Sequence, residues 1–177
     1  MGKINSANEI LRNEGLSSLF NAILGFTKVR IYKNIFRPNS IFANWPDLKD
    51  RFKGERVFLI GNGPSLNETP LYLLKNEYTM AFNRINLLFE RLSWKPTFYT
   101  IADERVAHDI KDDINKFTND ISYVFMPDIH PRGYTFKNHF FNKKHIYWLD
   151  TYGKGFYKTL PKVGINRTVA NVGIQIL

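Results

Sequence analysis

The sequence predicts an α/β fold: a Rossmann-like, mostly parallel sheet with helices on both faces, preceded by a helical N-terminal extension. Short apolar runs alternate with helical patterns from residue 57 onward. The first run, residues 57–60, stops at Gly61-Asn62-Gly63-Pro64-Ser65, and a strand that runs into a glycine turn is typical of phosphate sites in α/β proteins. With 177 residues, of which 44% are hydrophobic, the chain can bury the core of one such domain.

The expected elements follow one another in the order that a parallel sheet needs. Helical spacing predicts helices over residues 70–76, 85–92, 106–117 and 168–177, and Thr69 with Pro70 is a typical helix start. We expect the run 57–60 to be a buried strand and its glycine turn to lead into a helix whose N–H groups face the ligand. Apolar runs with turn signals at their ends predict strands over residues 57–60, 78–82, 97–101, 121–125 and 146–149.

Turn signals near residues 38–50 divide the chain into a helical extension, residues 1–50, and a nucleotide-binding domain, residues 51–177. In the extension, residues 5–35 have a helical pattern in which apolar residues between Leu16 and Leu24 are followed by four basic residues. Two interpretations stay open. The helix packs on the protein with a solvated basic end, or residues 16–37 contact an anionic membrane surface.

Composition narrows the class of protein. The net charge is +9, which suits phosphate-bearing ligands, and the absence of cysteine excludes disulfides and thiolate chemistry. We find no signal peptide and no apolar stretch long enough to span a bilayer, so we expect a cytoplasmic protein, with a peripheral position at the inner face of the membrane as the alternative. Basic and aromatic residues do not alternate as in nucleic-acid-binding surfaces, so no nucleic acid is expected.

The end of the chain is apolar from Val169 to Leu177 and carries no helix-stop signal. We therefore expect the nucleotide-binding domain to be incomplete at this end, with further strands beyond it. The catalytic residues would then lie C-terminal to this chain and stay unidentified.

Polar residues follow the predicted strands, at the edge where open α/β sheets bind ligands. Each group also has a plain structural interpretation, as a tight turn, an ordinary loop, a solvated helix start or a helix cap. The four histidines show no metal-ligand spacing, and we interpret each as structural or exposed. The candidate binding residues are Gly61, Asn62, Gly63, Pro64, Ser65, Asn83, Arg84, Asp103, Asn166, Arg167 and Thr168, and Asp103 with Glu104 is a candidate magnesium pair.

Five stretches of the sequence resemble a known family. They are residues 53–54, 57–66 (Val-Phe-Leu-Ile-Gly-Asn-Gly-Pro-Ser-Leu), 74–79, 81–86 (Ala-Phe-Asn-Arg-Ile-Asn) and 94–100 (Trp-Lys-Pro-Thr-Phe-Tyr-Thr). Together they look like the bacterial 6-hydroxymethylpterin pyrophosphokinase MptE-like family. Its wider relatives are the motility-associated Maf glycosyltransferases and the small bacterial sialyltransferases that use CMP-sialic acid. The resemblance covers residues 53–105 and 164–177 and none of residues 1–50.

The resemblance implies roles for particular residues. In the sialyltransferase relatives the glycine turn and the asparagine after the second strand hold the CMP moiety, which corresponds here to Gly61, Asn62, Gly63 and Asn83. Asn166-Arg167-Thr168 is similar to a stretch that opens a helix near the donor in those relatives. The MptE-like relatives often have Gly-Gly-Thr-Val there, so this chain is closer to the transferases. The relatives' catalytic histidine lies beyond the matching region.

Three functions follow as hypotheses. The first is a glycosyltransferase with a CMP-nonulosonic-acid donor and a glycan or protein acceptor, in surface-polysaccharide biosynthesis or flagellin glycosylation, with Arg167 neutralising phosphate charge and no metal. The second is an MptE-like diphosphotransferase that uses ATP and magnesium, with Asp103 or Glu104 as ligand. The third is a nucleotide-binding module without catalysis. The sequence leaves the acceptor and the oligomeric state open.

Overall fold

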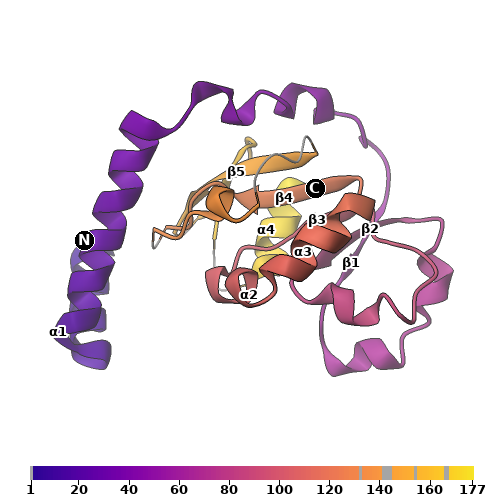
Figure 1. Ribbon diagram of the computed structural model, residues 1–177, viewed down its shortest axis with the longest axis horizontal. Helices are drawn as coiled ribbons and strands as arrows, with labels where there is room; N and C mark the ends of the chain where they lie inside the picture. The colour runs from indigo at the N-terminus through magenta and orange to yellow at the C-terminus, as the bar shows by residue number, and fades with distance from the viewer. Residues whose placement is uncertain (1, 132, 141–144, 154, 166–167) are drawn as a thin grey trace.

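The computed structural model describes residues 2–131, 133–140, 145–153, 155–165 and 168–177. Within them, six strands form one sheet in the order β1-β2-β3-β4-β5-β6, and every neighbouring pair is parallel (Figure 1). Helices cover both faces, so the α/β class with a helical N-terminal extension is confirmed. The strands are β1 Val57–Ile60, β2 Tyr78–Phe82, β3 Phe98–Thr100, β4 Tyr123–Pro127, β5 Ile146–Tyr152 and β6 Lys162–Gly164.

Two strands differ from the expectation. β1 lies at the edge of the sheet, and its Phe58 and Leu59 are exposed, so it is not the buried strand that its apolar composition predicts. β6 was not predicted, because three residues are too short to show an alternating pattern. It exists through its pairing with the end of β5, where Asp150 lies opposite Lys162.

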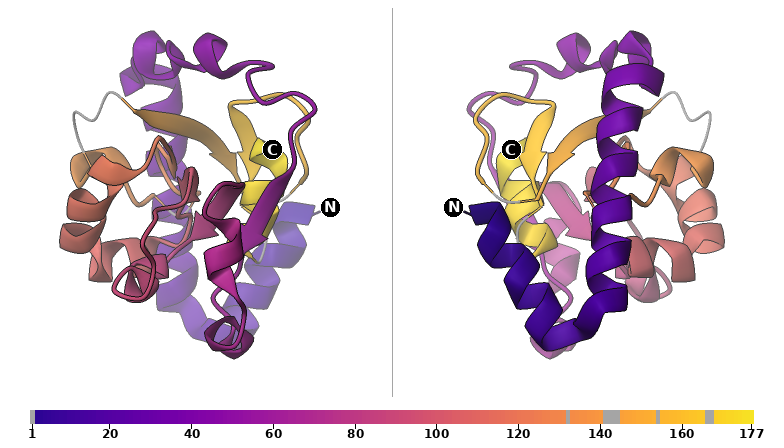
Figure 2. Two further views of the ribbon diagram at one scale, coloured as in Figure 1. Left: turned by 90° about the vertical axis from the view of Figure 1, so that its right-hand side faces the viewer. Right: turned by 90° about the vertical axis from the view of Figure 1, so that its left-hand side faces the viewer.

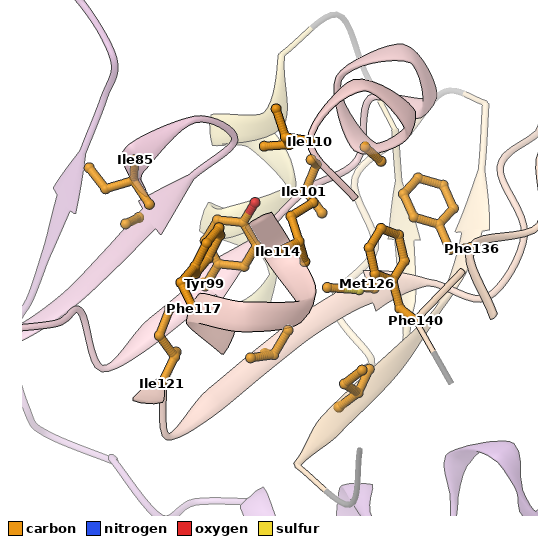
Figure 3. Packing of buried hydrophobic residues seen from close by; sticks show 14 of the residues in the cluster. Ile85, Tyr99, Ile101, Ile110, Ile114, Phe117, Ile121, Met126, Phe136 and Phe140 are labelled. Carbon is orange, nitrogen blue, oxygen red and sulfur yellow. The ribbon is translucent and has the colours of Figure 1, made fainter. Parts of the chain in front are cut away.

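The connections between β1 and β5 cover one face of the sheet, where they enclose the first hydrophobic cluster (Figure 3). Tyr99 and Met126 enter this cluster from the strands, and Ile114 and Phe117 enter it from α3. The predicted helix 106–117 is two helices, α2 Glu104–Asp109 and α3 Lys111–Phe117. Other connections are single 3₁₀ turns, at Pro64–Asn67, Leu71–Leu74, Ile85–Leu88, Thr118–Asp120 and Phe136–Asn138.

These turns correct the helices predicted over residues 70–76 and 85–92 and after the glycine turn. The predicted segments have apolar residues at helical spacing, but the connections that contain them form only single turns. A single turn is enough to bury Leu71 and Ile85 against the sheet, and an isolated short helix is not stable on its own.

The opposite face is covered by α4 Val169–Ile176 and by residues that precede β1. Val172 and Ile176 of α4 belong there to the second hydrophobic cluster, which also contains Trp45. At Gly173 the helix approaches β2 so closely that an added Cβ would lie 2.6 Å from the Phe82 ring. The helix predicted over residues 168–177 is therefore confirmed, and its apolar residues are divided between this contact and the surface.

The N-terminal extension begins with α1, Gly2–Ile31, which bends at Gly15, where φ is 84° and ψ is 178° (Figure 2). A left-handed φ of this kind strains other residues, so glycine suits the bend. A π-helical turn, Tyr32–Phe36, and 3₁₀ turns at Asn39–Phe42 and Trp45–Leu48 continue the chain. Although α1 has 30 residues, none of the helices in the described ranges combines the length and apolar content that crossing a membrane requires.

The segment after α1 also completes the sheet. The Asn44 side chain donates to the Ile146 carbonyl at 3.0 Å, and the Trp45 indole donates to the Trp148 carbonyl at 2.8 Å. β6 pairs only with residues 150–152 of β5, so these side chains satisfy carbonyls that β6 does not reach. The first half of β5 is thereby protected as an edge.

Candidate functional site

The carboxyl ends of the parallel strands meet at one edge of the sheet, which we call the carboxyl edge, and most of the candidate residues lie there. Gly61 follows β1, Asn83 follows β2, and Asp103 lies just beyond β3. Thr168 caps α4 by accepting a hydrogen bond from the Ala170 N–H at 3.0 Å. Asn166 and Arg167 lie outside the described residues.

The glycine turn is exposed along its whole length, residues 61–65. A Cβ added at Gly61 would meet nothing within 4 Å, and one at Gly63 would meet only Ser65 Oγ, at 3.9 Å. Neither glycine has a positive φ. Packing and backbone conformation therefore do not require glycine here, and an uncrowded backbone remains that a ligand can approach.

The turn does not lead into an α-helix. Pro64–Asn67 is a single 3₁₀ turn that has no side-chain cap, so Ser65 does not act as the predicted cap. A turn of this length has no aligned stack of peptide dipoles, and the predicted phosphate site at a helix N-terminus is not formed. Asn62 instead ties the turn to the next strand, because its Nδ2 donates to the Phe82 carbonyl at 2.9 Å.

Asn83 has the most unusual geometry on this edge. Its φ is 47°, in the left-handed region, where asparagine is one of the few non-glycine residues that occur. Its N–H donates to the Thr100 carbonyl at 3.3 Å, and its carbonyl accepts from the Tyr99 hydroxyl at 2.8 Å. Burial raises the pKa of Tyr99, which keeps this hydroxyl a donor.

The side-chain oxygen of Asn83 is buried and has no hydrogen-bond partner among the described residues. Leaving a buried acceptor unpaired costs about 1–3 kcal/mol, and such groups are rare in folded proteins. Other buried side-chain atoms of the described residues, such as Asn86 Oδ1 and Thr100 Oγ1, also lack a hydrogen bond, so the combination with a left-handed backbone is what makes Asn83 a candidate.

Arg84 is paired within the protein. Its Nη2 lies 3.2 Å from Asp109 Oδ2 of α2, and both side chains are exposed. Screening by water and salt makes such a pair weak, so the guanidinium can exchange Asp109 for a phosphate at little cost.

The two carboxylates proposed for magnesium have different partners. Asp103 caps α2, since its Oδ1 accepts from the backbone N–H groups of Arg105 at 2.8 Å and Val106 at 3.1 Å. Glu104 Oε2 lies 2.7 Å from His130 Nδ1. Within the described residues, no three His, Cys, Asp or Glu side chains converge as a metal site needs. One oxygen of each carboxylate therefore already has a partner within the protein, and a magnesium site formed by Asp103 and Glu104 stays a prediction.

The pairing of His130 with Glu104 was not foreseen, because residues on different strand ends show no spacing signal. Tyr134 and His139, which come after β4, stack with ring centroids 5.3 Å apart. An open depression of about 630 Å³ adjoins this group and is lined by Glu104, Arg105, His108, Asp109, Gly133 and Tyr134.

A second polar cluster at the carboxyl edge was also missed. Asp128, directly after β4, is fully buried, and its Oδ2 lies 2.9 Å from Arg37 Nε. Asp150 of β5 lies 2.8 Å from Arg37 Nη2 and 2.7 Å from Lys33 Nζ, and it accepts from the Tyr152 hydroxyl at 3.0 Å. Lys33 and Arg37 are therefore neither a solvated basic end nor available to lipid, as the sequence interpretations had them.

The pKa values of the two aspartates are shifted in opposite directions. Burial raises the pKa of Asp128 from 3.8 to about 6, against the lowering effect of Arg37. Burial would also raise the pKa of Asp150, but hydrogen bonds from Arg37 and Lys33 outweigh it and hold that pKa below its ordinary value. We call Lys33, Arg37, Asp128 and Asp150 the buried ion cluster.

Comparison of the chain with protein-family models, with curated proteins and with solved structures finds no match. The fold and the geometry of the carboxyl edge therefore define the class, an α/β protein with a parallel sheet.

Proposed function

We propose that this chain is the nucleotide-binding part of a glycosyltransferase that uses a CMP-sugar donor of the nonulosonic-acid type. The acceptor would be a bacterial surface polysaccharide or flagellin, and the reaction would take place in the cytoplasm. The proposal rests on the resemblance of residues 53–105 to the sialyltransferase relatives. The structural observation that carries it is Asn83, with its left-handed backbone and unpaired buried side-chain oxygen.

The chemistry of Asn83 favours particular nucleotides. An amide oxygen accepts hydrogen bonds, so its matching partner on a ligand is an amino group or a hydroxyl. The exocyclic amine of cytosine is such a donor, whereas uracil has a carbonyl at the same position. Asn83 Oδ1 is buried, so a ligand would reach it only after the side chain turned towards solvent, and a donor there would then remove the cost of the unpaired acceptor. A cytosine nucleotide with its phosphate towards the turn at residues 61–65 would satisfy both features.

The diphosphotransferase alternative has less support. It needs an ATP-bound magnesium ion held by protein carboxylates. Asp103 and Glu104 are directed to a helix start and to His130, so the chain offers no matching pair of free carboxylates there.

Thermal-shift titration with CMP, CDP, UDP, GDP, ADP and ATP, each with and without magnesium, tests the proposal. Binding to the native state stabilises it in proportion to occupancy, so the melting temperature reports affinity. We expect CMP and CDP to raise the melting temperature without magnesium. A shift with ATP only in the presence of magnesium would support the diphosphotransferase instead, and no shift with any nucleotide would contradict nucleotide binding.

A substitution at Asn83 tests the residue directly. Asn83→Gly removes the amide but suits the left-handed backbone, so it separates binding from folding better than Asn83→Ala. We expect CMP affinity to fall by at least about tenfold in Asn83→Gly, which corresponds to one lost hydrogen bond. Asn76→Ala, an exposed asparagine before the other end of β2, is the matched control and should bind CMP as the parent chain does.

A further inference from the structure

The second half of α1 presents large apolar side chains to solvent. Leu16 is 76% exposed and Phe20 is 62% exposed, and Ile23, Leu24 and Ile31 are exposed as well. Their spacing of three, four and seven residues places them on one side of the helix. We call these five residues the outer stripe. Contiguous exposed apolar surface of this kind marks an interaction site more often than chance.

The helix is held so that the outer stripe faces away from the domain. Ser18, Ala22, Gly25 and Val29 lie on the other side of the helix, and Gly25 is buried. A Cβ added at Gly133 would lie 3.3 Å from Gly25 Cα, so the helix packs closely on the loop after β4. Figure 2 shows both limbs of α1 in front of the domain in the right-hand view, with no described element outside them.

The charged side chains that flank the outer stripe are positive. Lys28 and Arg30 are exposed on either side of it, with Lys28 Cδ close to Gly133 on the domain side, and neither forms an ion pair with a described residue. Residues 15–46 contain no aspartate or glutamate. An apolar face flanked by cations is complementary to a surface that is apolar inside and anionic at its boundary.

We propose that the outer stripe of α1, with Lys28 and Arg30 beside it, docks on an anionic lipid surface. The helix lies along the surface, with Phe20 and the leucines in the acyl boundary and the two cations at the headgroups. Lys33 and Arg37 hold the end of the same helix to β4 and β5 through the buried ion cluster. Docking therefore keeps the carboxyl edge of the sheet close to the lipid. This inference does not depend on the proposed function.

A second copy of the chain fits the outer stripe less well. A symmetric dimer through this face would place the same patch on both subunits. Lys28 and Arg30 of both copies would then lie at one interface with no acid in residues 15–46 to neutralise them, and like charges across an interface oppose binding.

Co-sedimentation of the full chain with vesicles tests the proposal. The vesicles are made of phosphatidylcholine alone or of phosphatidylcholine with phosphatidylglycerol, at low and high salt. We expect binding to the phosphatidylglycerol vesicles at low salt, and binding at least about tenfold weaker to phosphatidylcholine alone or at high salt. Failure to bind the anionic vesicles would overturn the proposal.

Variants show whether the outer stripe is the contact. Leu16→Gln and Phe20→Gln should each weaken vesicle binding several-fold, because each removes apolar area from the bilayer boundary. Leu87→Gln, at a leucine that is 71% exposed on another part of the surface, is the matched control and should bind as the parent chain does. The exposed positions leave folding intact, which the thermal melt of each variant checks. Equal loss in the control would overturn the assignment of the surface.

Analytical ultracentrifugation without lipid tests whether a second copy of the chain binds the outer stripe instead. We expect the same sedimentation for the parent chain and for Phe20→Gln. A parent chain that self-associates and a variant that does not would identify the outer stripe as an interface between copies, and the lipid proposal would be wrong.

Discussion

Asp128 and Asp150, at the ends of β4 and β5, are held by two cations from the N-terminal segment, whereas Asn83, after β2, keeps a buried oxygen without a partner. Both groups lie on the carboxyl edge of the same sheet. At β4 and β5 the chain itself supplies the partners, through Lys33 and Arg37. At β1 and β2 it leaves an exposed glycine turn and an unsatisfied acceptor.

This comparison distinguishes polar side chains that already have partners within the fold from polar side chains that a ligand could bind. A buried carboxylate that forms an ion pair with a guanidinium has its charge neutralised by the fold, and loss of that guanidinium should affect stability first. The unpaired Asn83 oxygen has no partner among the described residues and could receive one from a ligand once the side chain turns towards solvent, so removal of this side chain should affect binding first. Substitutions in each of the two regions test this division.

The largest effect is expected from Arg37→Met. The substitution leaves Asp128 buried without its cation, and breaking a buried pair in this way costs about 3–5 kcal/mol of unfolding free energy. Urea denaturation followed by circular dichroism measures it. Arg56→Met is the control, because Arg56 forms an exposed pair with Glu77, and its loss should leave the curve almost unchanged. Equal effects would show that the buried ion cluster is not structural.

The pH dependence of stability provides the next test. The folded pKa of Asp128, about 6, lies above its ordinary value of 3.8, so the folded state binds the proton more tightly than the unfolded state. The stability that protonated Asp128 contributes is therefore fully present below pH 3.8 and is lost as the pH rises from there through about 6. Asp128→Asn has no proton to lose, so the parent chain should lose stability relative to it over this range, by on the order of 3 kcal/mol. Denaturation curves at several pH values measure the difference, and parallel pH profiles would contradict the raised pKa.

Gly63→Val should act on binding and leave folding nearly unchanged. A side chain there has room in the structure but occupies the approach to the turn, so CMP affinity should fall at least about tenfold. Gly173→Ala is the opposite case, because its Cβ would overlap the Phe82 ring and cost about 1–3 kcal/mol of stability. Calorimetric titration and thermal melts on both variants separate the two roles. A Gly63→Val variant that melts early but binds normally would make the turn a structural one.

The smallest effect concerns Arg84. Its exposed pair with Asp109 contributes about 0.5 kcal/mol or less, so Arg84→Ala and Asp109→Ala should both fold normally. If Arg84 also meets a phosphate, only Arg84→Ala should weaken CMP binding. Calorimetric titration of both variants with CMP measures this difference. Equal CMP affinities for Arg84→Ala and Asp109→Ala would show that Arg84 is not part of the binding site.

Local patterns predicted much of the fold. Five of the strands were found because an apolar run with turn residues at its ends is a local signal, and the final helix was found because Thr168 caps a regular apolar pattern. The helices predicted over 70–76 and 85–92 were wrong because apolar spacing does not reveal that a single turn is enough to bury Leu71 and Ile85 against the sheet. β6 was missed because only β5 makes it a strand.

The candidate site divides in the same way. The sequence pointed to residues 61–65 and Asn83, because residues after predicted strands must lie at the carboxyl edge. It did not point to the left-handed backbone of Asn83 or to the contact of Glu104 with His130, because both depend on how neighbouring strand ends meet.

The sequence by itself determined the parallel α/β class and the edge where polar groups gather, because both follow from short-range alternation of apolar and polar residues. Only the tertiary structure decided which of those groups are already paired. Lys33 and Asp150 are 117 residues apart in the chain, and no periodicity connects them. Their contact arises because α1 packs on the loop after β4, where desolvation makes a partner necessary for each charge.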